Sequence, residues 1–378
     1  MRFPNYSGEW QVSPMGKVCT FSKGYGISKE NLSNDGTPCI LYGELYTTYK
    51  TAIAKNIKSK TSLDSTILFH SKKNDVIIPC SGETAEDIAT SVCIPYDDIL
   101  LGGDLTVIRS DLDGAFLSNQ INSVRKYDIA RIAQGKSIVH LQADELKKIS
   151  IAYPTIDEQQ KISGFIDKID ERIEVQNKII SKYETLIKGI RHRVFGSICG
   201  EKQSSLGSFL EEYSEKNVAN NLQSVAVGKY GIRKREEIYS KELSADYSKN
   251  KVIRKNTLII GMGSTQIDIG ILTTDDCYCV SPAYTTYRIK GVNSFYLQEY
   301  LIELNPLLSV RYMITSARQG KAVNKEDLMK HLMTIHSENE QKEICKCFEN
   351  LYSRLQIEKE MLSALQKQKA FLLQSMFI

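Results

Sequence analysis

Two segments of the chain carry apolar residues at alternating steps of three and four positions. In the first, aliphatic residues stand at positions 162, 166, 169, 173, 180, 187, 190 and 194, and Gln176 and Tyr183 complete the series. In the second, the series runs Ile344, Phe348, Leu351, Leu355, Leu362, Leu365, Leu372 and Met376, with Glu358 and Lys369 interrupting it. Such spacing is typical of the seam of a coiled coil. Neither segment contains Pro beyond its start, so each is predicted to be one helix of about 40 residues and roughly 60 Å.

The two segments are copies of one another. A shift of 182 positions brings Glu158-Gln159 onto Glu340-Gln341 and continues without a gap to Val194-Phe195 on Met376-Phe377. Two unrelated amphipathic helices in a bundle would explain the apolar stripes, but not this matched register. Further matches lie outside the helices: Gln134-Gly135-Lys136 with Gln319-Gly320-Lys321, and Met15-Gly16 with Leu206-Gly207. The chain is therefore interpreted as an internal repeat.

The repeat gives the order module, helix, module, helix. The predicted boundaries are 1–155 and 197–335 for the modules, and 156–196 and 336–378 for the helices. Within the modules, short β-rich runs at 75–79, 105–109, 257–261 and 284–289 alternate with turn residues, and 294–305 is expected to be helical. The fold class is therefore α+β, with two mixed modules. If the apolar seams pair, the shortest connection makes the helices antiparallel, with one module at each end and a pseudo-two-fold relation between them.

Charge is distributed unevenly, although the formal net charge of +4 is small. The stretch 45–63 contains Lys50, Lys55, Lys58 and Lys60 and no acidic residue. The stretch 229–255 has a net charge of +5 and includes Arg233-Lys234-Arg235. Tyrosines are interleaved with both. Any single lysine here is more simply a solvated surface residue, but one such cluster in each repeat favours equivalent sites that bind the phosphates and base edges of DNA.

No catalytic or metal-binding pattern is found. Ala130 stands where a phosphate-binding loop before Gly135-Lys136 requires Gly, and Gly261-Met262-Gly263 lacks the third Gly of a dinucleotide turn. The five histidines form no triad or ligand spacing, and the nine cysteines include no CxxC pair. We expect buried or idle thiols in a reducing compartment. The start of the chain has no apolar leader, and no run of 18 apolar residues occurs, so a cytoplasmic location is expected.

The chain resembles the specificity subunits of type I restriction–modification enzymes along essentially its whole length. The most specific part is Pro154, Glu158-Gln159, Ile162, Phe165 and Asp170 at the opening of the first helix, together with the repeat. The resemblance also includes Arg2-Phe3-Pro4, Gly8-Glu9-Trp10, Ser81-Gly82-Glu83-Thr84, Gly231-Ile232, Arg235, Ser281-Pro282-Ala283-Tyr284 and Ser316-Ala317-Arg318-Gln319-Gly320-Lys321. The second helix departs from the pattern, with His336, Cys347 and Tyr352 at the positions of Pro154, Phe165 and Asp170.

The resemblance implies a non-catalytic DNA-binding subunit. Each module would be a target recognition domain that reads one half of a bipartite, asymmetric site in double-stranded DNA. The paired helices would space the two domains and dock two methyltransferase subunits, which bind S-adenosylmethionine and methylate adenine; the chain itself would need no cofactor. Restriction subunits, which translocate and cut DNA, are possible further partners.

The clusters and the resemblance together give two sets of predicted site residues. The predicted DNA contacts are Tyr42, Tyr46, Lys50, Lys55, Lys58, Lys60, Ser81, Gly82, Thr84, Lys136, Lys229, Tyr230, Arg233, Lys234, Arg235, Arg254, Lys255, Tyr284, Arg318 and Lys321. The residues predicted to form the spacer helices and to serve partner binding are Glu158, Gln159, Ile162, Ile166, Ile169, Ile173, Ile180, Glu340, Gln341, Ile344, Phe348, Leu351, Leu355 and Leu362.

Two alternatives remain open at this stage. The chain could be the C-terminal specificity part of a fused restriction–methylation enzyme, in which case catalytic motifs would lie upstream in the same reading frame; its own Met and family-like start argue against this. It could also be a tether whose coiled coil is the function, which predicts no salt-sensitive DNA binding.

Overall fold

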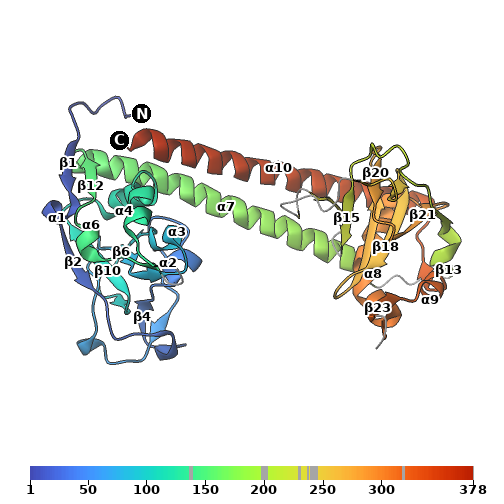
Figure 1. Ribbon diagram of the computed structural model, residues 1–378, viewed down its shortest axis with the longest axis horizontal. Coiled ribbons are helices and arrows are strands. Elements are labelled where there is room, and N and C mark those ends of the chain that lie inside the picture. The colour runs from blue at the N-terminus through green and yellow to red at the C-terminus, as the bar shows by residue number, and fades with distance from the viewer. Residues whose placement is uncertain are drawn as a thin grey trace. The chain divides into compact units, whose positions relative to one another are not determined.

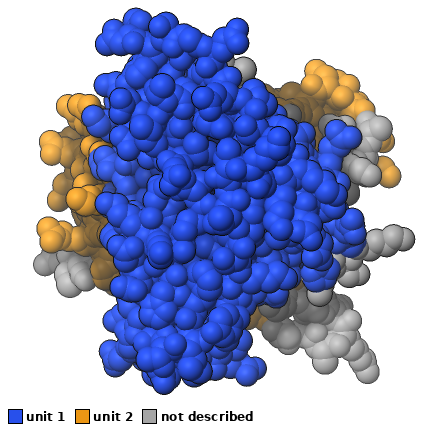
Figure 2. Space-filling model, turned by 90° about the vertical axis from the view of Figure 1, so that its left-hand side faces the viewer, with its two compact units in different colours: residues 1–178, 359–378 blue, residues 179–358 orange. Residues whose placement is uncertain are grey.

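The structure, a computed structural model, describes residues 1–135, 139–196, 203–228, 231–235, 238, 246–316 and 320–377. The chain forms two compact units. The first consists of Met1–Lys178 with Lys359–Ile378, and the second of Ile179–Glu358 (Figure 2). Each unit therefore contains one β-rich module together with the opening part of one long helix and the closing part of the other.

The two long helices predicted from the apolar periodicity are confirmed. They are α7 (Ile156–Phe195) and α10 (Glu338–Met376), of 40 and 39 residues (Figure 1). In the first unit, Ile162 and Ile166 of α7 share one apolar cluster with Leu372 and Met376 of α10. In the second unit, the rings of Phe195 and Phe348 stack at 6.2 Å. Within each unit the helices thus pack antiparallel, and the predicted seam positions are buried or half-buried.

The elements of the first module are short. In chain order they are β1 (Gln11–Pro14), α1 (Met15–Val18), β2 (Cys19–Lys23), η1 (Lys29–Asn31), β3 (Leu32–Ser33), β4 (Thr37–Ile40), α2 (Glu44–Thr47), β5 (Lys60–Thr61), η2 (Ser65–Ile67), β6 (Val76–Pro79), β7 (Ser81–Gly82), α3 (Ala85–Ile88), β8 (Val92–Cys93), β9 (Leu100–Leu101), β10 (Leu105–Ser110), α4 (Gly114–Asn122), α5 (Lys126–Ile132), β11 (Val139–His140), α6 (Ala143–Leu146) and β12 (Ser150–Tyr153).

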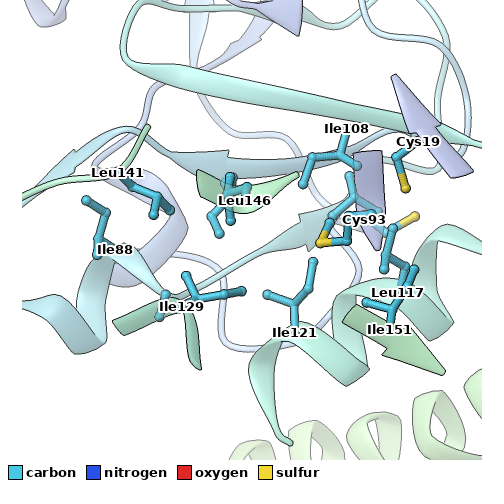
Figure 3. Packing of buried hydrophobic residues seen from close by; sticks show 14 of the residues in the cluster. Cys19, Ile88, Cys93, Ile108, Leu117, Ile121, Ile129, Leu141, Leu146 and Ile151 are labelled. Atoms are coloured by element: carbon cyan, nitrogen blue, oxygen red, sulfur yellow. The ribbon is translucent and has the colours of Figure 1, made fainter. Parts of the chain in front are cut away.

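The central sheet of this module is antiparallel, in the order β2-β10-β6-β8, and is covered on both faces. Side chains alternate between the faces of a strand. Accordingly Val76 and Ile78 of β6 enter one apolar cluster, shown in part in Figure 3, whereas Ile77 enters another. The β-rich runs at 75–79 and 105–109, which were predicted as strands, are confirmed as β6 and β10. A second sheet has the order β3-β5-β4-β9.

The second module has a corresponding sheet in the order β14-β21-β18-β19. Its elements are β13 (Gln203–Ser205), η3 (Leu206–Phe209), β14 (Leu210–Tyr213), β15 (Val225–Gly228), β16 (Gly231–Lys234), β17 (Lys251–Ile253), β18 (Thr257–Met262), β19 (Ile267–Leu272), β20 (Tyr278–Val280), β21 (Thr285–Ile289), α8 (Ser294–Tyr312), β22 (Met313–Ser316), β23 (Gly320–Val323), α9 (Lys325–Met329) and β24 (Leu332–Thr334). The predicted strands at 257–261 and 284–289 are confirmed as β18 and β21. The predicted helix at 294–305 is longer than expected and continues through Pro306.

The internal repeat is confirmed in individual contacts. In the first unit, the backbone N–H of Met15 donates to the carbonyl of Ile149 at 2.8 Å; in the second, that of Leu206 donates to the carbonyl of His331 at 2.9 Å. Gly16 lies against Lys147, which directly follows α6, and Gly207 lies against Met329, the last residue of α9; a Cβ atom would approach these residues to 2.9 and 3.1 Å. The matched Met-Gly and Leu-Gly pairs therefore have the same packing role in both modules.

Candidate nucleic-acid interface

The first basic segment, residues 45–63, is anchored to its module by apolar side chains. Leu45, Tyr49 and Ala54 are buried in the cluster that covers one face of the central sheet. The predicted DNA contacts of this segment lie around these anchors: Lys50 and Lys58 are exposed, Lys55 and Lys60 are half-buried, Tyr42 is exposed and Tyr46 is half-buried. In the part of the chain that the structure describes, no carboxylate lies within ion-pair distance of the Lys50, Lys58 or Lys60 side chains.

A groove of about 770 Å³ separates this segment from the two long helices within the first unit. Its charged lining residues are Lys50, Lys55, Lys58, Lys369, Asp167, Asp170, Glu171 and Glu174. Four lysines thus face four carboxylates, and the groove as a whole has no excess positive charge. The charges that line the groove therefore balance, and the groove as a whole does not favour an anion.

Lys55 is bound by helix α7. Its ammonium lies 2.7 Å from Asp167 and 2.7 Å from Glu171, two acidic residues one helical turn apart. Burial alone would lower the pKa of the Lys55 ammonium, but its hydrogen bonds to the two carboxylates outweigh burial and raise the pKa above its ordinary value. The structure thus gives this predicted DNA contact an intramolecular partner.

The Ser81-Gly82-Glu83-Thr84 motif also has local structural roles. Ser81 and Gly82 are buried in β7, which pairs with β11. Thr84 caps helix α3, since its hydroxyl accepts a hydrogen bond from the backbone N–H of Asp87 at 3.1 Å and donates to the Asp87 carboxylate at 2.7 Å. The spacing Thr-x-x-Asp is a sequence signature of such a cap, so this role could have been recognised from the sequence.

The second basic segment is described only in part. Arg233 and Lys234 lie on β16, which pairs with β15, and both are exposed, whereas Arg235 is half-buried. Arg233 and Lys234 line a pocket of about 340 Å³ whose other walls come from β19 and α8. Lys136, Lys229, Tyr230 and Arg318 lie outside the described residues, and for Lys321 only its place in β23 is described.

Three other predicted contacts of the second module have partners within it. Arg254 forms a two-pronged ion pair with Glu215 at 2.6 and 2.7 Å, and Lys255 pairs with Asp275 at 3.0 Å. The Tyr284 hydroxyl donates to the carbonyl of Val227 at 3.1 Å. The ring of Tyr284 lies directly over Gly261, where a Cβ atom would meet it at 2.1 Å. Gly261 is therefore required by packing in the sheet, and not by a nucleotide.

The glutamate of the Glu-Gln pair that opens each long helix binds residues of its own unit. Glu158 is buried and forms an ion pair with Arg2 at 2.7 Å. Glu340, its counterpart, instead accepts hydrogen bonds from the backbone N–H and the hydroxyl of Ser337, at 2.8 and 2.6 Å. These bonds lower the pKa of Glu340. The seam residues predicted alongside them, from Ile162 to Leu362, are buried or half-buried in the units.

Two polar contacts in the helix packing were not predicted. In the first unit, Lys369 of α10 pairs with the buried Asp170 of α7 at 2.5 Å. In the second, Arg191 of α7 pairs with the fully buried Glu299 of α8 at 2.8 Å, and Tyr352 of α10 hydrogen-bonds both. Lys369 was visible in the sequence as a break in the apolar seam, but nothing in the sequence indicated its partner.

The described residues contain no cluster of ligands suited to a metal ion. Burial raises the pKa of Cys19, Cys39 and Cys345 to about 11 and that of Cys93 to about 12. These thiols stay protonated near neutral pH, as expected for inert core residues. Among the described helices, none is long and apolar enough to cross a membrane.

Comparisons with known proteins agree with this architecture. Residues 7–185 match the sequence model of the family described as "Type I restriction modification DNA specificity domain". The fold is similar to the crystal structure of the type I restriction–modification system S subunit from M. genitalium, with a TM-score of 0.61 and 16% identity over 100% of this chain and 98% of that one. It is also similar to a chain from a structure concerning complex assembly and conformational transition of the type I R-M system, with a TM-score of 0.60 and 16% identity over 97% of each chain.

Proposed function

We propose that this chain, whose residues 7–185 match the model of the type I restriction modification DNA specificity domain, is a DNA specificity subunit of that family and reads a bipartite DNA site with its two modules. In this proposal the chain is the non-catalytic specificity component of a type I restriction–modification system; the match of residues 7–185 to the family model supports this role. In this proposal each module, 1–155 and 197–335, is a target recognition domain for one half-site. The helical segments 156–196 and 336–378 hold the two domains at a set spacing.

The observation that carries the proposal is the duplication of one arrangement with a separate basic segment in each copy. The two units repeat the same backbone contacts, and each presents exposed cations on its own module, Lys50 and Lys58 in the first and Arg233 and Lys234 in the second. Two related but different modules suit two different half-sites, and hence an asymmetric target. Cations exposed on both modules support phosphate contacts on both halves.

The predicted contacts differ in how well the structure supports them. No described carboxylate pairs with four of the predicted contacts: Lys50, Lys58, Lys60 and Lys234. This favours their contact with phosphate. Arg254 and Lys255 would first have to leave Glu215 and Asp275. The proposed phosphate contacts therefore concentrate on Lys50, Lys58 and Lys60 in the first module and on β16 in the second.

The proposed partners are double-stranded DNA and two methyltransferase subunits, with restriction subunits as further members of the complex. Support comes from apolar side chains that the long helices leave exposed: Val175, Leu186, Ile357, Met361 and Phe371, each 47–58% accessible. In this proposal the methyltransferase subunits cover these side chains. S-adenosylmethionine would bind to the methyltransferase subunits, in the cytoplasm, where the host DNA lies.

The experiment combines the purified chain with its cognate methyltransferase subunit, S-adenosylmethionine and genomic DNA, and sequences the methylated adenines. The expected result is a complex with two methyltransferase copies that marks one bipartite motif with a fixed spacer, while the chain alone neither methylates nor cuts. Methyl transfer by the sequence-verified chain alone would contradict the non-catalytic role. Methylation at a single continuous motif would contradict reading by two modules.

A further inference from the structure

Lys55 links the first module to helix α7 through a rigid part of the module. On its N-terminal side, Ala54 is fully buried, and its backbone N–H donates to the carbonyl of Cys93 on the edge strand β8 at 2.9 Å. The N–H of Cys93 donates in turn to the carbonyl of Ala52 at 2.7 Å. The carbonyl of Lys55 itself accepts a hydrogen bond from the Tyr96 hydroxyl at 2.7 Å. The Lys55 backbone is therefore fixed to the edge of the central sheet.

The acceptors of the Lys55 ammonium are equally well fixed. Asp167 and Glu171 lie on α7 beside Ile166 and Ile169, which are buried in the packing of α7 against α10. A side chain that joins a sheet edge to a packed helix resists rotation of the module on the helix. The side chains of Lys55 and Asp167 are only 38% and 25% exposed, so their ion pair is partly shielded from solvent, whereas the Glu171 side chain is 59% exposed.

The surroundings argue against phosphate as the partner of Lys55. A phosphate would have to displace two carboxylates that already satisfy the ammonium, in a groove whose charged lining sums to zero. Lys58 lines the same groove, but its side chain is exposed and no described carboxylate pairs with it. Of these two lysines of one segment, Lys55 is therefore neutralised by carboxylates of α7, whereas Lys58 is not.

From this geometry we infer that Lys55 is a positioning residue: with Asp167 and Glu171 it sets the angle of the first module on α7, and thereby the number of unread base pairs between the half-sites. The inference rests on the proposed function, because only a chain that reads two half-sites has a spacer to set. A shift of the reading surface by about 3.4 Å along the duplex corresponds to one base pair. In the second unit, the ion pair of Arg191 with Glu299 joins α7 to the other module in a comparable way.

The test uses the full chain in complex with its methyltransferase subunit and a library of duplexes that contain the half-sites at every spacer length from short to long. Four proteins are compared: the native chain, Lys55→Ala, Lys58→Ala, and the charge reversal Lys55→Glu with Asp167→Lys and Glu171→Lys. For each, the selected spacer lengths, the half-site sequences and the dependence of binding on salt concentration are measured. Lys55→Met, which keeps the aliphatic part of the side chain, serves as a second variant should Lys55→Ala fold poorly.

The native complex is expected to select one spacer length. Lys55→Ala should select the same half-sites with an unchanged salt slope, but with a distribution that spreads to neighbouring spacer lengths; the charge reversal should restore a single length. Lys58→Ala should keep the native spacer and lower the salt slope by about 0.9, the value for one lost phosphate contact. A general loss of stability would weaken binding at all spacers alike and would not broaden the distribution.

Two results would overturn the inference. In the first, Lys55→Ala lowers the salt slope by about 0.9 and leaves the spacer unchanged, which would make Lys55 a phosphate contact. In the second, Lys55→Ala and Lys55→Met change neither quantity. Selection of no bipartite motif by the native complex is a separate outcome, which would overturn the proposed function and with it the need for a spacer.

Discussion

The side-chain carbonyl of Gln159 accepts a hydrogen bond from the backbone N–H of Asp113 at 2.9 Å. Asp113 is the N-cap of α4, and Gln159 lies in the first turns of α7, so this bond joins the start of a module helix to the start of a long helix. The amide of Gln159 also donates to the carbonyl of Pro154 at 2.8 Å. In the second unit, Gln341 repeats both bonds, with the N–H of Asn293 at 3.1 Å and the carbonyl of His336 at 2.9 Å.

Replacing this glutamine should therefore destabilise either unit. In Gln159→Ala, the buried carbonyl of Pro154 and the partly buried N–H of Asp113 lose their partner, which is expected to lower the free energy of unfolding by about 1–3 kcal/mol. Gln341→Ala should cost a similar amount in the second unit. Urea unfolding measures the change. Gln160 is exposed on the same turn, so Gln160→Ala is the matched control and should change stability by less than about 0.5 kcal/mol. If the Gln159 and Gln160 substitutions lowered stability equally, the two hydrogen bonds of the Gln159 side chain would not be the cause.

The buried contact of Tyr352 with Glu299 and Arg191 predicts a loss of stability at high pH. Burial, reinforced by the nearby Glu299, raises the pKa of Tyr352 from 10.0 to about 12. Between these values the unfolded chain releases the phenol proton while the folded chain retains it. The stability that Tyr352 contributes is thus complete below about pH 10 and falls as the pH rises through about 12.

Tyr352→Phe isolates this contribution. At pH 8 the variant should be less stable than the native chain by about 1.5–3 kcal/mol, because the phenol hydroxyl bonds charged groups. This difference should shrink as the pH is raised from 10 towards 12, since the native chain alone loses the contribution of Tyr352. Thermal unfolding of both proteins over that pH range measures the difference in stability. The titration of the other tyrosines affects both proteins alike and therefore does not contribute to this difference. A difference that stays constant across the range would show that Tyr352 ionises alike in both states.

The sequence predicted those parts of the fold that depend on regular spacing. The apolar steps of three and four gave both long helices, and the 182-residue shift gave the repeat, because a helix seam and a duplicated module impose a period on the chain. The strands β6, β10, β18 and β21 were predicted from short runs rich in β-branched, aliphatic and aromatic residues between turn residues, a composition that suits a mostly buried strand.

The candidate site was less accessible to sequence reasoning, because it depends on which side chains meet. Lys55 and Asp167 are separated by 112 positions, and no pattern along the chain distinguishes a lysine that pairs with a distant carboxylate from one that contacts phosphate. The same holds for Arg191 and Glu299. Thr84 is a different case. Its capping signature is present in the sequence, but Thr84 was predicted as a DNA contact because it belongs to a motif of the family.

The length of the paired helices is predicted to set the spacer between the half-sites. Deletion of residues 176–182 and 358–364 removes one heptad from each helix, keeps the 182-residue correspondence and continues the apolar seam. Neither segment contains a residue of the contacts made by Lys55, Arg191 or Gln159. The deletion shortens each helix by about 10 Å at 1.5 Å per residue. At about 3.4 Å per base pair, the selected spacer should become about three base pairs shorter while both half-site sequences stay the same.

Duplicating the same two heptads should lengthen the spacer by a similar amount. The deletion and duplication variants are therefore expected to change the preferred spacer in opposite directions. Three base pairs also rotate the duplex by about 100°, whereas seven helical residues fall only about 20° short of two full turns, so both variants should bind more weakly than the native complex. Selection from duplexes with fixed half-sites and variable spacers gives the preferred length for each protein. A deletion or duplication variant that folds, binds and still selects the native spacer would show that the helices do not determine the distance between the half-sites.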